Sequence, residues 1–312
     1  MKYLITGGAG FIGSNLVSRI IKEATKVIVI DNLITGSNEN LKKFEKYENF
    51  VFHSHDIQNH FDPQENIDFV IHLASCASPV AYSNHPINTL KSGSIGTINA
   101  LGIARKYGSK FLLSSTSEVY GDPKVTPQPE SYWGNVNPVG PRSMYDESKR
   151  FAEAATQAYI SEYSLNAKII RIFNTYGPSM QINDGRVVTN FIVQALKNQD
   201  ITIYGDGSQT RSFCYVDDLV AGLMMLMESS ESGPVNIGNP NEFTIKELAE
   251  KIRGQINPSL GVVDLPLPQD DPMQRQPVIQ LAREKLNWEP NIQLDEGLSH
   301  TITDFQKRIC SM

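Results

Sequence analysis

A tyrosine and a lysine four residues apart form the pair with the most definite chemistry in this sequence. Tyr145 and Lys149 lie in a stretch with helical periodicity, so both side chains are expected on one face of a helix. A nearby ammonium group stabilises a phenolate, so Lys149 should lower the pKa of Tyr145 and let it act as a base near neutral pH. Tyr120 and Lys124 share this spacing, but Gly121-Asp122-Pro123 between them predicts a turn.

A run of hydroxyl residues that ends in a carboxylate could hold an alcohol beside that base. The run Ser114–Glu118 follows an apolar strand-like segment, and ligands of parallel sheets bind at the carboxyl ends of strands. Thr116 and Ser117 could therefore hydrogen-bond an alcohol that is being oxidised. Taken alone, each hydroxyl is also explained by a turn or a helix cap, and Glu118 by a structural salt bridge. Together with the tyrosine–lysine pair, the run favours redox chemistry.

Oxidation of an alcohol needs a hydride acceptor, and a loop near the N-terminus suits a dinucleotide. Gly8-Ala9-Gly10-Phe11-Ile12-Gly13 joins a strand-like run to a helical pattern, so the backbone and a helix N-terminus can approach a pyrophosphate. Asp31 closes the second strand, where a carboxylate binds ribose hydroxyls and repels a 2′-phosphate. These features predict NAD as the cofactor. The alternative is a glycine turn that serves only strand–helix packing.

Residues near the ends of the following strands are expected to complete the NAD site. Asp56 could accept a hydrogen bond from the adenine amino group, or it could be an ordinary turn carboxylate. Tyr145 and Lys149 would face the cofactor as well as the substrate. The other expected contacts are Gly7, Gly10, Phe11, Ile12, Gly13, Asp31, Asn32, Thr35, Gly36, Ile57, Leu73 and Ala74.

The elements that must position these residues alternate between buried strands and helices. Apolar runs without polar alternation predict strands that are buried on both faces. Alternation with helices, including a long one over 143–163, predicts a doubly wound parallel Rossmann sheet of the α/β class. The expected strands are 3–5, 27–30, 50–52, 69–73, 111–113 and 168–172.

The pattern loosens after Asn174, and this change suggests a second lobe. We expect 1–174 to form the NAD-binding domain and 175–312 a smaller, discontinuous lobe that closes over a ligand. The segment 208–238 is expected to return to the first domain. Short helices are predicted over 187–197 and 244–256.

Composition narrows the class of partner. A net charge of −6, from 28 basic and 34 acidic residues, argues against nucleic acid. Cys76, Cys214 and Cys310 are odd in number and widely spaced, so we expect free thiols and no metal site. No signal-peptide pattern and no apolar run of about 18 residues is seen, which predicts a cytoplasmic protein without a membrane span.

These features resemble the extended short-chain dehydrogenase/reductases, and among them the UDP-glucuronate decarboxylases, also called UDP-xylose synthases. The similarity extends over nearly the whole chain. It rests on the stretches Ala77–Pro79, Ser115–Pro123, Tyr132–Pro138, Arg171–Pro178, Asp184–Val188 and Tyr204–Phe213.

The resemblance implies a UDP-sugar substrate and a homodimer built on helices near 87–106 and 143–163. It places Arg211 and Arg275 at the substrate diphosphate or carboxylate, a role for which the planar guanidinium is suited. The remaining substrate contacts that it implies are Pro79 and Tyr82 beside the sugar, Asn174 and Val188 at the nucleotide half, and Tyr204 and Gln209 at the uracil.

Within this family the triplet Thr116-Ser117-Glu118 favours decarboxylation. Related 4,6-dehydratases typically have Asp at the middle position, as the acid that protonates a departing hydroxyl, and Ser117 cannot do this. Carbon dioxide needs no such acid. Glu118 would orient the sugar or assist proton movement. The alternatives are a related 4-epimerase or 4,6-dehydratase, and an NAD-binding sensor without activity.

Two departures from the family pattern stand out. Gly93 occupies a helical position where the family usually has Asn, and a glycine there costs up to about 1 kcal/mol relative to alanine. The loop 35–40 lacks the basic residues that are often found there, which would weaken contacts to the NAD phosphates.

Overall fold

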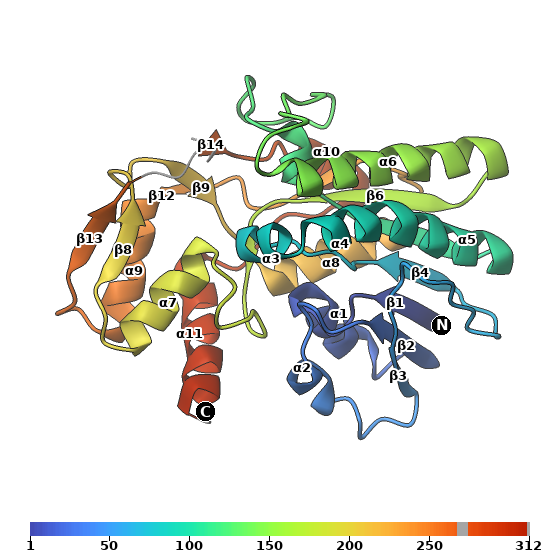
Figure 1. Ribbon diagram of the computed structural model, residues 1–312, viewed down its shortest axis with the longest axis horizontal. Helices are drawn as coiled ribbons and strands as arrows, with labels where there is room; N and C mark the ends of the chain where they lie inside the picture. Colours follow the sequence, from blue (N-terminus) through green and yellow to red (C-terminus); the bar gives the residue numbers. More distant parts are fainter. Residues whose placement is uncertain (267–273, 311–312) are drawn as a thin grey trace.

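A seven-stranded parallel sheet forms the centre of the molecule (Figure 1), in a computed structural model that describes residues 1–266 and 274–310. Its strand order is β11-β6-β5-β4-β1-β2-β3, so the order reverses between β1 and β4. Ligands of such sheets bind at this switch point. The strands are β1 (Lys2–Thr6), β2 (Lys26–Asp31), β3 (Phe50–Ser54), β4 (Phe69–His72), β5 (Lys110–Thr116), β6 (Ala167–Ile172) and β11 (Val235–Ile237). The predicted strands and the doubly wound α/β class are confirmed.

The two faces of the sheet bury two separate hydrophobic cores, which explains why its strands are apolar without alternation. One core joins Ile5 and Ile71 to residues of α1 (Phe11–Ile20) and α8 (Val216–Glu228). The other joins Leu4 and Val70 to α5 (Thr97–Tyr107) and α6 (Ser143–Tyr163). Strands β1 to β6 therefore contribute apolar side chains to both sides of the sheet.

The helix before β5 contains a π-helical turn that lies against α6. The helical segments α4 (Pro86–Lys91), η1 (Ser92–Gly96) and α5 follow one another directly, and η1 has the π-helical form. A Cβ placed on Gly93 would lie 2.6 Å from Cβ of Ser148 in α6. Glycine therefore allows η1 to approach α6 closely. This close packing explains why position 93 departs from the family pattern.

A smaller group of elements lies beside the sheet (Figure 1, left). It contains the parallel pair β8 (Ile201–Tyr204) and β13 (Val262–Leu265), and the three-stranded sheet β12-β9-β14. Its helices are α7 (Val187–Leu196), α9 (Ile245–Ile256) and α11 (Leu294–Cys310). The three short strands are β9 (Thr210–Ser212), β12 (Glu242–Thr244) and β14 (Gln274–Arg275).

The chain passes between the two parts several times. Strand β10 (Cys214–Tyr215) pairs with β7 (Thr175–Tyr176), α8 then contacts α1 beneath the large sheet, and β11 pairs with β6. The remaining helices are α2 (Asn38–Lys42), α3 (Pro79–Asn84), α10 (Gln280–Leu286) and the 3₁₀ turn η2 (Ser117–Tyr120).

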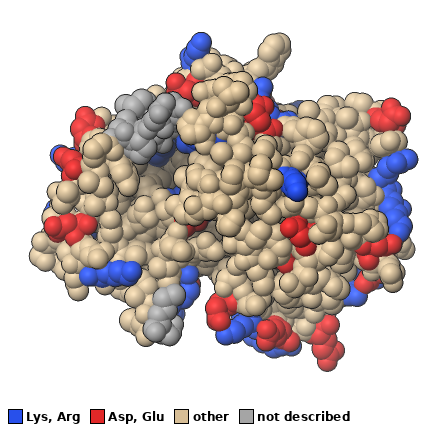
Figure 2. Space-filling model, viewed as in Figure 1, with Lys and Arg blue, Asp and Glu red and all other residues tan. Residues whose placement is uncertain are grey.

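Charges on the viewed face are mixed in sign. Figure 2 shows acidic and basic side chains interspersed, mostly around the rim of this face. In the part of the chain that is described, no helix has the length and apolar character needed to cross a bilayer. Within the same residues, no group of three or more His, Cys, Asp and Glu side chains is arranged to hold a metal ion.

Candidate active site

One cavity of about 680 Å³ collects nearly all of the residues that the sequence singled out. It runs from the glycine loop, past the end of β5, to the smaller group of elements. Of the predicted site residues, Gly36 and Asp56 are the two that do not line it. The cavity wall thus contains residues from α1, β2, β5, α6, α7, β8, β9 and β14, and residues that directly follow β1 and β4.

The glycine loop closes tightly on its neighbours and opens the start of α1 to the cavity. Gly7 has a φ of +74°, and a Cβ there would lie 2.7 Å from the Ala74 nitrogen. A Cβ on Gly13 would collide with the carbonyl oxygen of Gly7. Gly10, at the N-cap of α1, provides no side-chain hydrogen bond to the helix. The N-terminal amides of α1 therefore point into the cavity without a side-chain cap.

Asp31 is held at the cavity wall by two backbone amides. Its carboxylate accepts hydrogen bonds from the nitrogens of Ala9 at 3.0 Å and Leu33 at 2.8 Å. Burial raises the pKa of Asp31, and these two hydrogen bonds oppose the rise. A Cβ on Gly36 would lie 2.7 Å from an Asp31 oxygen. Gly36 therefore makes room for Asp31 behind the wall. It does not line the cavity, in contrast to the NAD contact predicted for it.

Asp56 also lies behind the wall. Its carboxylate accepts hydrogen bonds from Nδ2 of Asn32 and the nitrogen of Gln58, at 3.0 and 2.9 Å. Its neighbours His55 and Ile57 line the cavity instead. Asp56 thus has the geometry of a turn carboxylate that positions Asn32, because both oxygens are directed at protein groups.

Tyr145, Lys149 and Thr116 meet where β5 ends against the first turns of α6. Lys149 donates a hydrogen bond from Nζ to the Ser114 carbonyl at 2.8 Å, and its Nζ lies 5.9 Å from the centre of the Tyr145 ring. The Thr116 hydroxyl is hydrogen-bonded to the Tyr145 side chain. The predicted helical face and strand end are therefore brought together in the structure.

The pKa of Tyr145 differs from the expectation. Burial raises the pKa of Tyr145, and the hydrogen bond from Thr116 and the charge of Arg186 only partly offset the rise. Burial also lowers the pKa of Lys149 to about 8, with Glu153 acting in the opposite direction. The charge of Lys149 is thus not enough to bring the pKa of Tyr145 below its usual range, because both groups are removed from water.

Tyr82 covers one face of the Tyr145 ring. The two rings stack with centroids 5.5 Å apart. Tyr82 belongs to α3, which begins at Pro79 and is capped by the Ser78 hydroxyl, an acceptor for the Ala81 nitrogen at 3.3 Å. Proline at the first helical position and serine before it explain why a helix starts here.

Glu118 lies between two arginines of the cavity wall. One oxygen accepts hydrogen bonds from Nη2 of Arg142 at 2.5 Å and Nη2 of Arg275 at 3.1 Å. Arg275 also donates to the Ser117 carbonyl at 2.6 Å. Burial raises the pKa of Glu118, but the charges of Arg275, Arg142 and Arg211 outweigh it and lower the pKa overall. Glu118 is therefore ionised, and it forms the kind of salt bridge that the sequence left open as an alternative.

The far end of the cavity is formed by the smaller group of elements. Gln209 donates a hydrogen bond from Nε2 to the Tyr204 carbonyl at 2.7 Å, and Arg211 donates from Nη1 to the Thr210 carbonyl at 2.9 Å. Asn174 and Val188 line the same region. The predicted substrate residues therefore all reach one cavity.

Two arginines in the cavity wall were not predicted. Arg142 directly precedes α6, and Arg186 forms an ion pair with Asp184 while its guanidinium lies 5.9 Å from the centre of the Phe11 ring. The stretch Asp184–Val188 carried the family resemblance, so its arginine was visible in the sequence. Its direction toward the cavity was not.

Comparisons with known proteins agree with this site. The curated UDP-glucuronic acid decarboxylase 5 of Arabidopsis thaliana is 52% identical over 310 residues, which cover 99% of this chain and 90% of that protein. The UDP-glucuronic acid decarboxylase 1 of Danio rerio is 49% identical over 308 residues, or 99% of this chain and 73% of that protein. The resemblance inferred from the motifs is confirmed.

Solved structures share the fold. The UDP-glucose 4-epimerase of Thermotoga maritima, solved with UDP-glucose, superposes with a TM-score of 0.91 at 32% identity and covers 99% of this chain and 100% of its own. The UDP-glucuronic acid 4-epimerase of Bacillus cereus, solved with UDP-glucuronic acid and NAD, gives 0.87 at 27% identity, with coverage of 99% and 100%. A family model described as the NAD dependent epimerase/dehydratase family matches residues 3–238, and the chain belongs to that family.

Proposed function

We propose that this protein converts UDP-glucuronate to UDP-xylose and carbon dioxide, with NAD as a cofactor that is reduced and reoxidised in each cycle. The proposal rests mainly on the side chains that surround Tyr145. A hydroxyl residue, Ser117, stands where a dehydratase would need an acid, and Glu118 is held as a carboxylate by Arg142 and Arg275. Relatives of about 50% identity with this activity support it.

The residues of the cavity fit NAD. The uncapped start of α1 suits a pyrophosphate, and the Asp31 carboxylate suits the adenosine ribose. A bound NAD would supply the acceptor for the hydride from C4 of the sugar and the donor for the later reduction of the C4 ketone. Tyr145 takes the proton of the 4-hydroxyl, Thr116 hydrogen-bonds that hydroxyl, and the Lys149 ammonium stabilises the phenolate.

Loss of carbon dioxide follows from the ketone at C4. The C6 carboxylate is then β to a carbonyl, so the electrons of the C5–C6 bond can pass into an enolate as carbon dioxide leaves. A proton is added at C5, and the hydride returns to C4. Ser117 is compatible with this route, because no hydroxyl has to be protonated as it departs. Arg275 and Arg142 supply positive charge for the sugar carboxylate.

The other contacts are assigned on the same basis. We assign Pro79 and Tyr82 to the sugar, and Asn174, Val188, Tyr204, Gln209 and Arg211 to the nucleotide, because all of them line the one cavity. The lobe formed by most of 175–312 would close over this nucleotide, with 1–174 as the NAD-binding domain. We also place the protein in the cytoplasm, since the buried free thiols Cys76 and Cys214 suit a reducing compartment.

Product analysis tests the function. UDP-glucuronate labelled with ¹³C at C6, incubated with protein and NAD in D₂O, should release labelled carbon dioxide and give UDP-xylose with one deuterium at C5, without accumulation of NADH. Loss of water would instead identify a dehydratase, and an unchanged mass an epimerase. Tyr145→Phe is the control, and it should lower the rate at least about 100-fold. A sensor would leave every sugar unchanged.

We further propose that the protein is a homodimer that pairs α4, η1, α5 and α6 with their copies. Apolar side chains are exposed along this face, and Figure 2 shows few charged side chains over it. Exposed apolar patches of this kind mark interaction sites. The exposed residues are Ile87, Leu90, Ile95, Ile98 and Phe151.

A further inference from the structure

A buried ion pair lies directly behind the catalytic tyrosine and lysine without lining the cavity. Arg171 on β6 donates from Nε and Nη2 to the two oxygens of Glu153 on α6, at 2.9 and 2.7 Å. The side chains are 11% and 15% exposed. Since neither residue lines the cavity, the pair does not touch substrate or cofactor.

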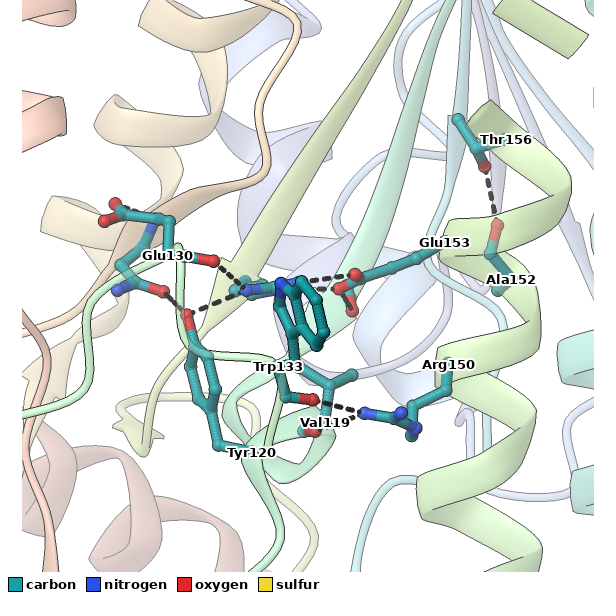
Figure 3. A network of polar contacts seen from close by, with 11 residues as sticks. Val119, Tyr120, Glu130, Trp133, Arg150, Ala152, Glu153 and Thr156 are labelled. Carbon is teal, nitrogen blue, oxygen red and sulfur yellow. Dashed lines mark hydrogen bonds and ion pairs between the residues drawn. The ribbon is translucent and has the colours of Figure 1, made fainter. Parts of the chain in front are cut away.

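The arginine of this pair is fixed on all sides. Its Nη1 donates to the hydroxyl of Tyr120 and to the carbonyl of Glu130, each at 3.0 Å. The Tyr120 hydroxyl in turn donates to Oδ1 of Asn236 at 2.7 Å. Figure 3 shows Glu153 reaching from α6 toward the region in which Tyr120 and Glu130 lie. Such a bidentate, fully bonded arginine holds the Glu153 carboxylate in one position.

The carboxylate also holds the end of β5. Ser115, next to Thr116, donates its hydroxyl to Oε1 of Glu153 at 2.5 Å. Tyr145, Lys149 and Glu153 are spaced by four residues, so they lie along one face of α6. All three bind the same strand end, through the Thr116 hydroxyl, the Ser114 carbonyl and the Ser115 hydroxyl respectively.

Helix α6 is anchored to the same region by a second arginine. Arg150 donates from Nη1 to the carbonyls of Val119 at 3.0 Å and Trp133 at 2.8 Å (Figure 3). This contact fixes η2 but places no charge partner near Lys149. Of the residues in this network, Glu153 is the one that has a fixed position and also carries a negative charge on the same face of α6 as Lys149.

We propose that Glu153 is a positioning residue of the reaction, which fixes a negative charge one helical turn from Lys149 and holds Thr116 in place through Ser115. Its role rests on the proposed function, since it acts only through Tyr145, Lys149 and Thr116. The consequence is that Lys149 keeps its ammonium form in a site from which water is excluded.

The direction of the effect follows from the surroundings of Lys149. The titratable groups that face it are Tyr145 and Glu153 on α6 and His72 on β4. Burial, together with the charge of Lys149, lowers the pKa of His72 to about 3, so that imidazole is neutral. Removal of the Glu153 charge lowers the pKa of Lys149 further, so the ammonium form is lost at a lower pH.

The test compares pH profiles of kcat/KM for UDP-glucuronate. In Glu153→Gln the alkaline limb should move down by about one pH unit, and kcat should fall more than KM changes. Glu153→Asp, which keeps the charge, should return the limb to its wild-type position. Glu162→Gln, the same change at an exposed position of α6, should leave the limb where it is.

A double variant separates charge from folding. Glu153→Gln/Arg171→Met removes both charges, so it should regain thermal stability relative to Glu153→Gln. Its alkaline limb should lie between those of Glu153→Gln and the wild type, because the unpaired guanidinium that also disfavours the Lys149 ammonium is removed as well. The proposal is overturned if the alkaline limb of Glu153→Gln matches that of the wild type. It is also overturned if the double variant restores both the thermal stability and the wild-type limb, because the pair is then only structural. Wild-type protein that leaves UDP-glucuronate unchanged would instead contradict the proposed function.

Discussion

Glu118 carries one negative charge between two arginines, and this arrangement determines what the residue can do. Its pKa lies below the usual range, so it cannot donate a proton to the substrate at neutral pH. Of the two roles considered from the sequence, orientation of the sugar therefore fits better than proton transfer. A substrate carboxylate that approaches this cluster meets Arg142 and Arg275, whose orientation depends on Glu118.

Replacement of Glu118 by Gln should destabilise the protein. Two arginines of the cavity wall would lose their shared partner, and we expect the free energy of unfolding to fall by about 3 kcal/mol. Urea denaturation measures this loss. Glu39→Gln is the matched control, because Glu39 pairs with Lys42 on the surface, with its side chain 70% exposed, and should change stability little. Equal losses in both variants would show that the arginines do not depend on Glu118.

Most site residues could be predicted because each follows from a local pattern. The glycine loop, Asp31 and the hydroxyl run are set by their places at strand ends. The residues that sequence reasoning misplaced or missed depend on tertiary contacts. Gly36 faces Asp31, and Asp56 binds Asn32. The raised pKa of Tyr145 comes from burial, which residue spacing does not reveal. The direction of Arg186 depends likewise on the packing around α7.

At the scale of elements, the contact between η1 and α6 sets the position of the catalytic helix. A Cβ on Gly93 would lie 2.6 Å from Cβ and 2.7 Å from Oγ of Ser148, next to Lys149. The sequence marked Gly93 as unusual but could not supply the reason, because the π-helical turn and the facing serine belong to different segments. The strands were predictable by contrast, since burial on both faces leaves a continuous apolar run.

Gly93→Ala should therefore be destabilising, by about 2 kcal/mol, as expected when a methyl group is forced into a packed contact. The double variant Gly93→Ala/Ser148→Gly should be more stable than the sum of the single changes, which thermal or urea unfolding would measure as a coupling energy. Gly102→Ala is the control on α5, where a Cβ meets nothing within 4 Å; it should be neutral or stabilising. Additive effects at 93 and 148 would contradict the packing argument.

At the scale of the whole molecule, the exposed apolar face on α4 to α6 and the candidate active site share helix α6. Helix α6 carries Tyr145 and Lys149 on its inner face and exposes Phe151 on its outer face. A partner that covers the outer face would therefore contact the helix that carries the tyrosine–lysine pair. The division of the chain at 174 stays a prediction, since the polypeptide crosses between the two parts more than once.

Ile95→Glu should convert the proposed dimer into a monomer. Ile95 is 46% exposed in η1, so a charge there is tolerated in the monomer but would be buried against a copy of itself. Light scattering should give half the mass of the wild type. Val139→Glu, on a loop and 90% exposed, is the control and should leave the mass unchanged. A wild-type protein that already has the mass of one chain would refute the dimer.

The glycine at position 93 also limits how the two facing positions can be engineered. While Ser148 is present, any side chain at 93 meets its Cβ and its hydroxyl oxygen. A redesign of this helix pair therefore has to treat positions 93 and 148 as one unit of substitution: a side chain can be added at one of them only if it is removed from the other.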